Sequence, residues 1–115
     1  MQAEALRDLV VNTLEEHQAR DIQVLDVRGF NSIADFFVLA SGTSSRHVRT
    51  SAEAVAWQAK QAGEPALGQE GLQEGEWALV DLNSVVVHVM QEPVRAYYQL
   101  EKLWLAPPNT VANSS

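Results

Sequence analysis

The sequence predicts an α/β domain of the layered α+β kind, with a mixed β-sheet and flanking helices. Segments with apolar residues at helical spacing alternate with shorter segments that are rich in β-branched and aromatic residues. The chain has 115 residues, of which 46% are hydrophobic, which suits one domain with a core but not two. We expect a single domain over residues 1–105 and a flexible tail over residues 106–115.

The first half of the chain predicts a helix, two strands and a second helix. Apolar residues recur every three or four positions over residues 3–19, as in an amphipathic helix. Residues 21–29 and 34–42 have strand composition and flank a turn-like segment, and the second strand is apolar on both faces, which predicts a central position. A stripe of small side chains over residues 45–62 predicts a helix that packs closely on the sheet and stops at Gly63.

The second half predicts a loop, a hairpin and a last helix. Residues 63–76 are rich in glycine and acidic residues, with a short strand expected around residues 65–68. Only Asn83 and Ser84 separate two apolar segments, 77–82 and 85–92, so these should pair as a hairpin. Pro93 is a favoured first helical residue, and the helical pattern continues to about Leu105.

The charge distribution bears on possible partners. Eight Lys and Arg residues against fifteen Asp and Glu residues give a net charge of -7, which disfavours direct binding to nucleic acid. Lys and Arg are absent from Gln61 to Val94, so one part of the surface should be acidic. Two interpretations remain open here: a solvated face that aids solubility, or a site for a basic protein partner.

Composition also bears on the compartment. The chain has no cysteine, which excludes disulfides and thiolate metal sites. Its uncharged apolar stretches reach about eight residues, well below the roughly 20 needed to span a bilayer. The first twenty residues are acidic and helical in pattern, unlike a secretory signal. We therefore expect a cytoplasmic protein without membrane contact.

A loop of small residues opens the second predicted helix and raises the question of phosphate binding. Gly42, Thr43, Ser44 and Ser45 supply this loop, and unpaired N–H groups at a helix start attract anions. A nucleotidyl-transfer site also needs two carboxylates at alternate positions on the next strand to hold a divalent metal, but that strand offers only Asp81. Asp26 and Asp35 do not fit that spacing. The pattern favours a helix start capped by Ser44 or Thr43 over a phosphate site.

Other catalytic and metal-binding patterns are weaker still. His17, His47 and His88 share no metal-ligand spacing, and no nucleophile elbow is present. We expect no enzyme activity, no metal and no cofactor. A nucleotidyltransferase-like enzyme that uses the loop of residues 42–45 is the second hypothesis.

The aromatic residues cluster in the second half of the chain. Strand alternation places Val85, Val87 and Val89 on one face, and Val86, His88 and Met90 on the other. Together with Trp77 and the last helix, the second face is either a wide core surface or an interface with aromatic anchors inside an acidic rim.

Three segments carry a family resemblance: "DFFVLASGTSSRHV", "WALVDLNSVVVHVMQE" and "YYQLEKLW". In this order and spacing they resemble the bacterial ribosomal silencing factors, the RsfS, YbeB or Iojap-like family, over residues 1–104. The resemblance implies a nucleotidyltransferase-like fold that lacks the catalytic carboxylates. It also implies binding to the large ribosomal subunit through ribosomal protein L-fourteen, which blocks joining of the small subunit and represses translation when nutrients are scarce.

The resemblance further implies which residues meet this partner. The segments contain the candidates for apolar contacts, which are Trp77, Leu82, Met90 and Tyr98. The candidates for a polar rim are Asp81, His88 and Glu70. We expect a monomer or a weak homodimer.

Overall fold

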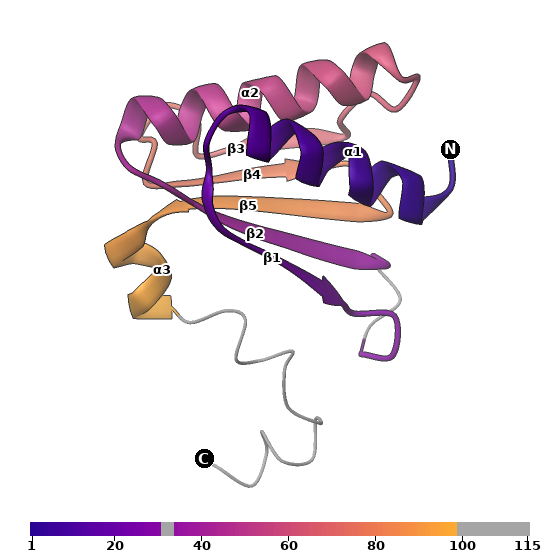
Figure 1. Ribbon diagram of the computed structural model, residues 1–115, viewed down its shortest axis with the longest axis horizontal. Coiled ribbons are helices and arrows are strands. Elements are labelled where there is room, and N and C mark those ends of the chain that lie inside the picture. The colour runs from indigo at the N-terminus through magenta and orange to yellow at the C-terminus, as the bar shows by residue number, and fades with distance from the viewer. Residues whose placement is uncertain (31–33, 99–115) are drawn as a thin grey trace, which may run out of the picture.

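The computed structural model describes residues 1–30 and 34–98, which build a five-stranded sheet and three helices (Figure 1). The strands are β1 (Arg20–Asp26), β2 (Phe36–Gly42), β3 (Gly68–Glu70), β4 (Trp77–Asp81) and β5 (Val85–Gln91). They lie in the order β1-β2-β5-β4-β3, with β2 and β5 parallel and the other neighbours antiparallel. The expected mixed sheet is confirmed, and β2 is an interior strand as its apolar sequence predicts.

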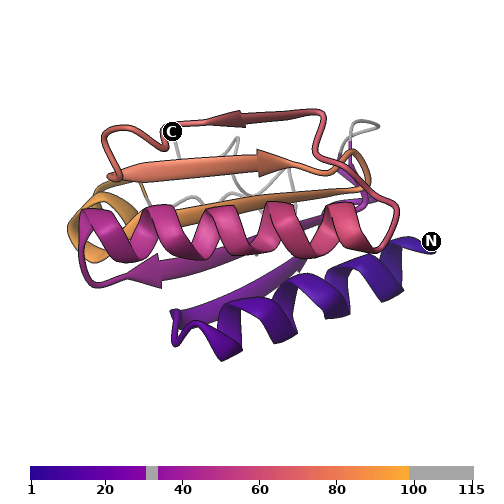
Figure 2. The same cartoon turned by 90° about the horizontal axis from the view of Figure 1, so that it is seen from above.

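Helices α1 (Ala3–Glu16) and α2 (Ser45–Gln61) lie side by side on one face of the sheet (Figure 2). Their buried side chains include Leu6, Val10 and Leu14 of α1, and they meet Val85, Val87 and Val89 of β5 in the larger core cluster. The small stripe of α2 is fully buried at Ala52 and Ala59, which lets the helix approach the strands closely. Helix α3 (Glu92–Tyr98) lies on the opposite face, against β5 and β2 (Figure 1).

The helix ends follow local backbone chemistry. Helix α1 ends three residues earlier than the predicted residue 19, because Gln18 adopts a left-handed conformation with φ of 61°. Helix α2 ends at Gln61, and Gly63 has φ of 86°, which confirms the predicted glycine stop. Helix α3 starts at Glu92, one residue before Pro93. The predicted continuation to Leu105 and the tail of residues 106–115 lie outside the described residues.

The β4–β5 hairpin forms as predicted. Leu82 N–H donates to Val85 O at 2.9 Å, and Asn83 takes the positive φ of 74° that a two-residue turn requires. Strand β3 is displaced from the predicted residues 65–68 to Gly68–Glu70, because its pairing is set by β4: Gly68 lies opposite Asp81, and Glu70 lies opposite Leu79. In the loop between β3 and β4, a Cβ on Gly71 would lie 1.9 Å from Trp77 O, so only glycine fits there.

The first hairpin is shorter than its sequence predicts. Strand β1 ends at Asp26 rather than residue 29, since the chain turns after Val27, whose carbonyl O accepts a hydrogen bond from Phe30 N–H at 3.0 Å. The two strands also shift register between Arg20 and Gln23, where Asp21 has φ of 49°. A bulge of this kind has no signal in the apolar pattern.

Candidate functional site

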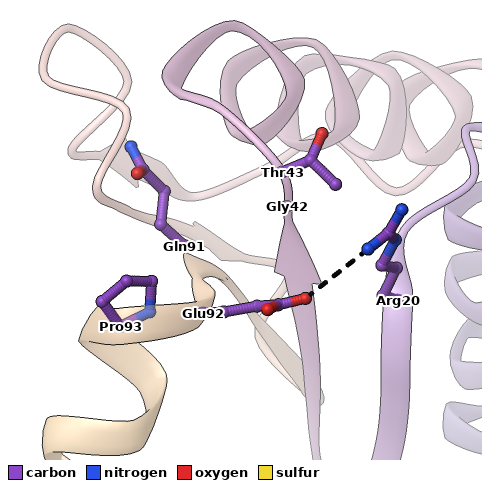
Figure 3. A pocket seen from close by; sticks show the side chains of 6 residues that line it. All are labelled: Arg20, Gly42, Thr43, Gln91, Glu92 and Pro93. Atoms are coloured by element: carbon purple, nitrogen blue, oxygen red, sulfur yellow. Dashed lines mark ion pairs between the residues drawn. The ribbon is translucent and has the colours of Figure 1, made fainter.

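The loop that opens α2 borders a small pocket at the ends of β2 and β5 (Figure 3). The cavity has a volume of about 210 Å³ and is lined by Arg20, Gly42, Thr43, Gln91, Glu92 and Pro93. Its one acidic side chain, Glu92, forms an ion pair with Arg20 at 3.9 Å (Figure 3). One carboxylate that is already paired does not make the two-acid metal site that nucleotidyl transfer requires.

Side chains of the chain itself already bind two backbone N–H groups at this loop. Ser44 Oγ accepts a hydrogen bond from His47 N–H at 3.0 Å, and Thr43 N–H donates to His47 Nδ1 at 2.9 Å. His47 Nε2 in turn donates to His17 O at 2.7 Å, which ties the start of α2 to the end of α1. The predicted N-cap is confirmed, and its residue is Ser44.

The carboxylates considered for a metal site have other roles. Asp26 pairs with Arg28 at 2.6 Å, and hydrogen bonds from Arg28 lower the pKa of Asp26 to about 2. Asp81 Oδ1 accepts from Asn83 N–H at 2.9 Å and so stabilises the hairpin turn. Over residues 1–30 and 34–98, no group of three or more His, Cys, Asp or Glu side chains could hold a metal ion.

The second candidate is the sheet face that α3 contacts, which we call the α3 face. The strand register places the following side chains on it: Phe37 and Leu39 of β2, Glu70 of β3, Trp77, Leu79 and Asp81 of β4, and Val86, His88 and Met90 of β5. Phe37, Trp77, Leu79, Asp81 and Val86 are half-buried, and Glu70 is exposed. This face therefore presents aromatic and aliphatic area at the surface, with carboxylates beside it.

An arginine fixes α3 over one end of this face. Arg95 is buried, and its Nη1 donates to Asp21 O at 2.6 Å and to Ser41 Oγ at 3.0 Å. These bonds join α3 to β1 and β2. Val94 packs against a second, smaller core cluster on this side of the sheet, which consists of Leu25, Val27, Ala34, Leu39 and Met90. The position of α3 is therefore set by buried polar contacts as well as by apolar packing.

A histidine and two aromatic rings form the centre of the α3 face. Trp77 Nε1–H donates to His88 Nδ1 at 3.0 Å. The imidazole also lies against the Phe37 ring, with centroids 5.4 Å apart and an angle of 61° between the planes. Burial lowers the pKa of His88 to about 4, so the ring is neutral near pH 7. His88 Nε2 is buried and has no hydrogen-bond partner among the described residues.

The structure brings five of the seven predicted contact residues to this face. They are Trp77, Asp81, Glu70, His88 and Met90. They differ in burial, however, since Met90 is 0% exposed and His88 is 7% exposed, so these two lie beneath the surface in the described chain rather than at its rim. His88 lies between the rings of Phe37 and Trp77, and Met90 packs in the cluster that Val94 of α3 contacts. One strand's sequence does not reveal these neighbours.

The other two predicted contact residues lie elsewhere. Leu82 is 3% exposed and belongs with Ala78 and Val80 to the core under α1 and α2, on the opposite side of the sheet from Trp77. Its even spacing from Ala78 places it there, since strand side chains alternate between faces. The side chain of Tyr98 lies outside the described part of the chain. The predicted contacts of both residues with a partner stay predictions.

Sequence reasoning missed three surface residues of the α3 face as contact candidates: Phe37, Leu79 and Val86. Leu79 could have been found, because it alternates with Trp77 and Asp81 on one strand. Phe37 could not, since it reaches this face through the parallel pairing of β2 with β5, which no local pattern predicts.

In the part of the chain that the structure describes, no helix has the length and apolarity needed to cross a membrane.

Comparisons with known proteins agree over almost the whole chain. The family model described as "Ribosomal silencing factor during starvation" matches residues 1–114. The ribosomal silencing factor RsfS of Haemophilus influenzae is 42% identical over 87% of this chain and 98% of its own length. That of Bacillus subtilis is 36% identical over 90% of this chain and 88% of its own length.

A solved structure supports the same relationship. The crystal structure of a Chromobacterium violaceum protein superposes with a TM-score of 0.90 at 38% identity, covering 93% of this chain and 89% of that one. The family model's match over residues 1–114 includes the residues of the α3 face and of the α2 loop. The chain belongs to the ribosomal silencing factor (RsfS) family.

Proposed function

We propose that this protein binds the large ribosomal subunit through ribosomal protein L-fourteen and thereby prevents the small subunit from joining. Its contact surface is the α3 face, and its effect is to repress translation under nutrient limitation. The family's description as silencing factors during starvation supports the role. The observation that supports the α3 face as the contact surface is its half-buried aromatic and aliphatic area around Trp77, with Glu70 and Asp81 beside it.

The chemistry of the α3 face fits such a partner. Protein interfaces combine an apolar, often aromatic centre with a polar rim, and the acidic rim complements a basic ribosomal protein. Met90 and His88 lie beside Trp77 on the neighbouring strand and are buried. Glu70 and Asp81 supply the rim. Tyr98 of α3 and Leu82 remain proposed as apolar contacts with the partner, although Leu82 is buried in the core on the other side of the sheet.

We propose a regulator without catalytic activity or cofactor, which acts in the cytoplasm as a monomer or weak homodimer. The hydrogen bonds that already engage Thr43 N–H and His47 N–H at the α2 loop support this over the nucleotidyltransferase-like alternative. Calorimetric titration distinguishes the two: saturable micromolar binding of a nucleoside triphosphate with magnesium would favour the enzyme.

The experiment compares two tryptophans on opposite layers. Trp77 lies on the α3 face, whereas Trp57 is 59% exposed on α2, on the other side of the sheet. Trp77→Ala should weaken co-sedimentation with purified large subunits about 30-fold or more, as for an aromatic anchor worth roughly 2 kcal/mol. Trp57→Ala should leave it unchanged.

Subunit joining is then followed by light scattering with small subunits added. The parent protein should slow joining, Trp57→Ala should do the same, and Trp77→Ala should not. Free ribosomal protein L-fourteen should compete for the parent. If Trp57→Ala abolishes binding while Trp77→Ala does not, the contact surface is the helix layer.

A further inference from the structure

The orientation of Trp77 on the α3 face is set by another side chain. Trp77 is the first residue of β4, and the second side-chain torsion of a tryptophan is broad, so the torsion itself allows several orientations of the indole. Here its one polar atom is used, since Nε1–H donates to His88 Nδ1 on the neighbouring strand at 3.0 Å. The bond selects one orientation of the indole relative to the sheet.

The acceptor is held firmly. The imidazole lies between two rings, with its centroid 5.4 Å from that of Phe37 and 5.9 Å from that of Trp77. An indole N–H is only a donor, so His88 Nδ1 must be the unprotonated nitrogen and Nε2 must carry the proton. Because the lowered pKa of His88 keeps the ring neutral, this acceptor persists at physiological pH.

Histidine is a costly choice at this position for packing alone. Its Nε2–H is buried without a hydrogen-bond partner among the described residues, and a buried donor without an acceptor destabilises the fold. A phenylalanine or leucine would fill the same space without that penalty. What only the imidazole provides in this cluster is the acceptor for Trp77.

We propose that His88 is the positioning residue of the contact surface: through Nδ1 it holds the Trp77 indole in the orientation that the partner recognises. This inference rests on the proposed function, since it takes Trp77 as the anchor for the large subunit. His88 itself need not touch the partner. This positioning role replaces the role in the polar rim that the sequence predicted for His88.

The test is a double-mutant cycle that separates the hydrogen bond from packing. His88→Phe keeps a ring of similar size and removes the acceptor, while Trp77→Phe keeps an aromatic ring and removes the donor. We expect His88→Phe to weaken large-subunit binding about five- to tenfold, the range that one lost hydrogen bond gives. In the Trp77→Phe background the same substitution should have no further effect, because the bond is already absent.

A spectroscopic readout accompanies the binding data. The indole N–H resonance of Trp77 is assigned by its disappearance in Trp77→Phe, and its hydrogen exchange is measured in the free protein. Exchange should be at least about tenfold faster in His88→Phe, since the N–H is no longer bonded. His88→Asn, whose Oδ1 takes the place of Nδ1, should slow exchange again and restore part of the affinity. Thermal unfolding confirms that each variant is folded at the temperature of the assay.

The outcomes separate this inference from the proposed function. If Trp77→Ala leaves binding intact, the proposed surface itself is wrong. If Trp77→Ala weakens binding but His88→Phe does not, the surface stands and the positioning role is overturned. The role is equally overturned if His88→Phe weakens binding as much in the Trp77→Phe background as in the parent, because His88 then acts through packing or direct contact.

Discussion

At the scale of single residues, neighbouring valines of β5 serve different surfaces. Val87 is fully buried beneath α1 and α2, whereas Val86 is half-buried on the α3 face. Val87→Ala removes two buried methyl groups and should lower the free energy of unfolding by about 2 kcal/mol. Denaturant unfolding provides the measurement, and the folded fraction should bind large subunits normally.

Val86→Ala is the matched variant on the other face. It should cost less than about 1 kcal/mol of stability, because the side chain keeps contact with solvent, but it should weaken binding. The faces would be wrongly assigned if Val86→Ala unfolded the protein while Val87→Ala impaired only binding.

His88 makes a further prediction at this scale, which concerns pH. Its pKa is about 4 in the fold against 6.5 for an ordinary histidine, so between these values the unfolded chain binds more protons than the folded one. The free energy of unfolding is therefore unaffected by this group above pH 6.5. It decreases as the pH falls toward 4, by at most about 3 kcal/mol from this group. Denaturant unfolding from pH 7 to 4 should show a shallower loss for His88→Phe. Identical profiles for the parent and His88→Phe would contradict this account.

At the scale of elements, the start of α2 is a cap rather than a ligand site. Ser44 Oγ accepts from His47 N–H, and the substitution Ser44→Ala removes that acceptor. We expect a loss on the order of 1 kcal/mol in unfolding free energy, with large-subunit binding nearly unchanged. Ser44→Asp supplies the control, since aspartate also caps helices and should restore stability. A large loss of binding in Ser44→Ala at full stability would instead make the loop part of the contact surface.

At the scale of the whole molecule, the net charge of -7 should draw the protein toward a basic partner. Glu70 is exposed on β3 beside the α3 face, and Glu53 is exposed on α2 on the opposite side of the sheet. Glu70→Lys should slow association with large subunits roughly three- to tenfold at low salt and flatten its salt dependence. Stopped-flow binding at two salt concentrations measures both effects.

Glu53→Lys makes the same change in net charge away from the proposed surface. Its association rate should therefore fall much less than that of Glu70→Lys, since screening limits the charge effect to about 8 to 10 Å. Equal effects of the two reversals would mean that only the overall charge matters and that the carboxylates beside Trp77 form a solvated face.

Much of this architecture follows from the sequence alone, because its causes are local. Helical periodicity, the glycine stop at Gly63, the two-residue turn at Asn83 and the cap at Ser44 each depend on residues a few positions apart. Alternation in β5 likewise separates Val87 from His88 onto two faces. The sequence also shows that the strand after α2 has only one carboxylate, Asp81, where a nucleotidyl-transfer site needs two at alternate positions.

Only the tertiary structure decided how these elements combine into a surface. Pairing of β5 with both β2 and β4 brings Phe37, His88 and Trp77 together, although 51 positions separate Phe37 from His88 in the chain. Side chains from neighbouring strands bury His88 beside Trp77, and Met90 is buried in a cluster that Val94 of α3 contacts. The sequence alone determined which side chains share a strand face. Their burial depended on long-range packing, which decides which of them are exposed to a partner and which are buried behind the surface.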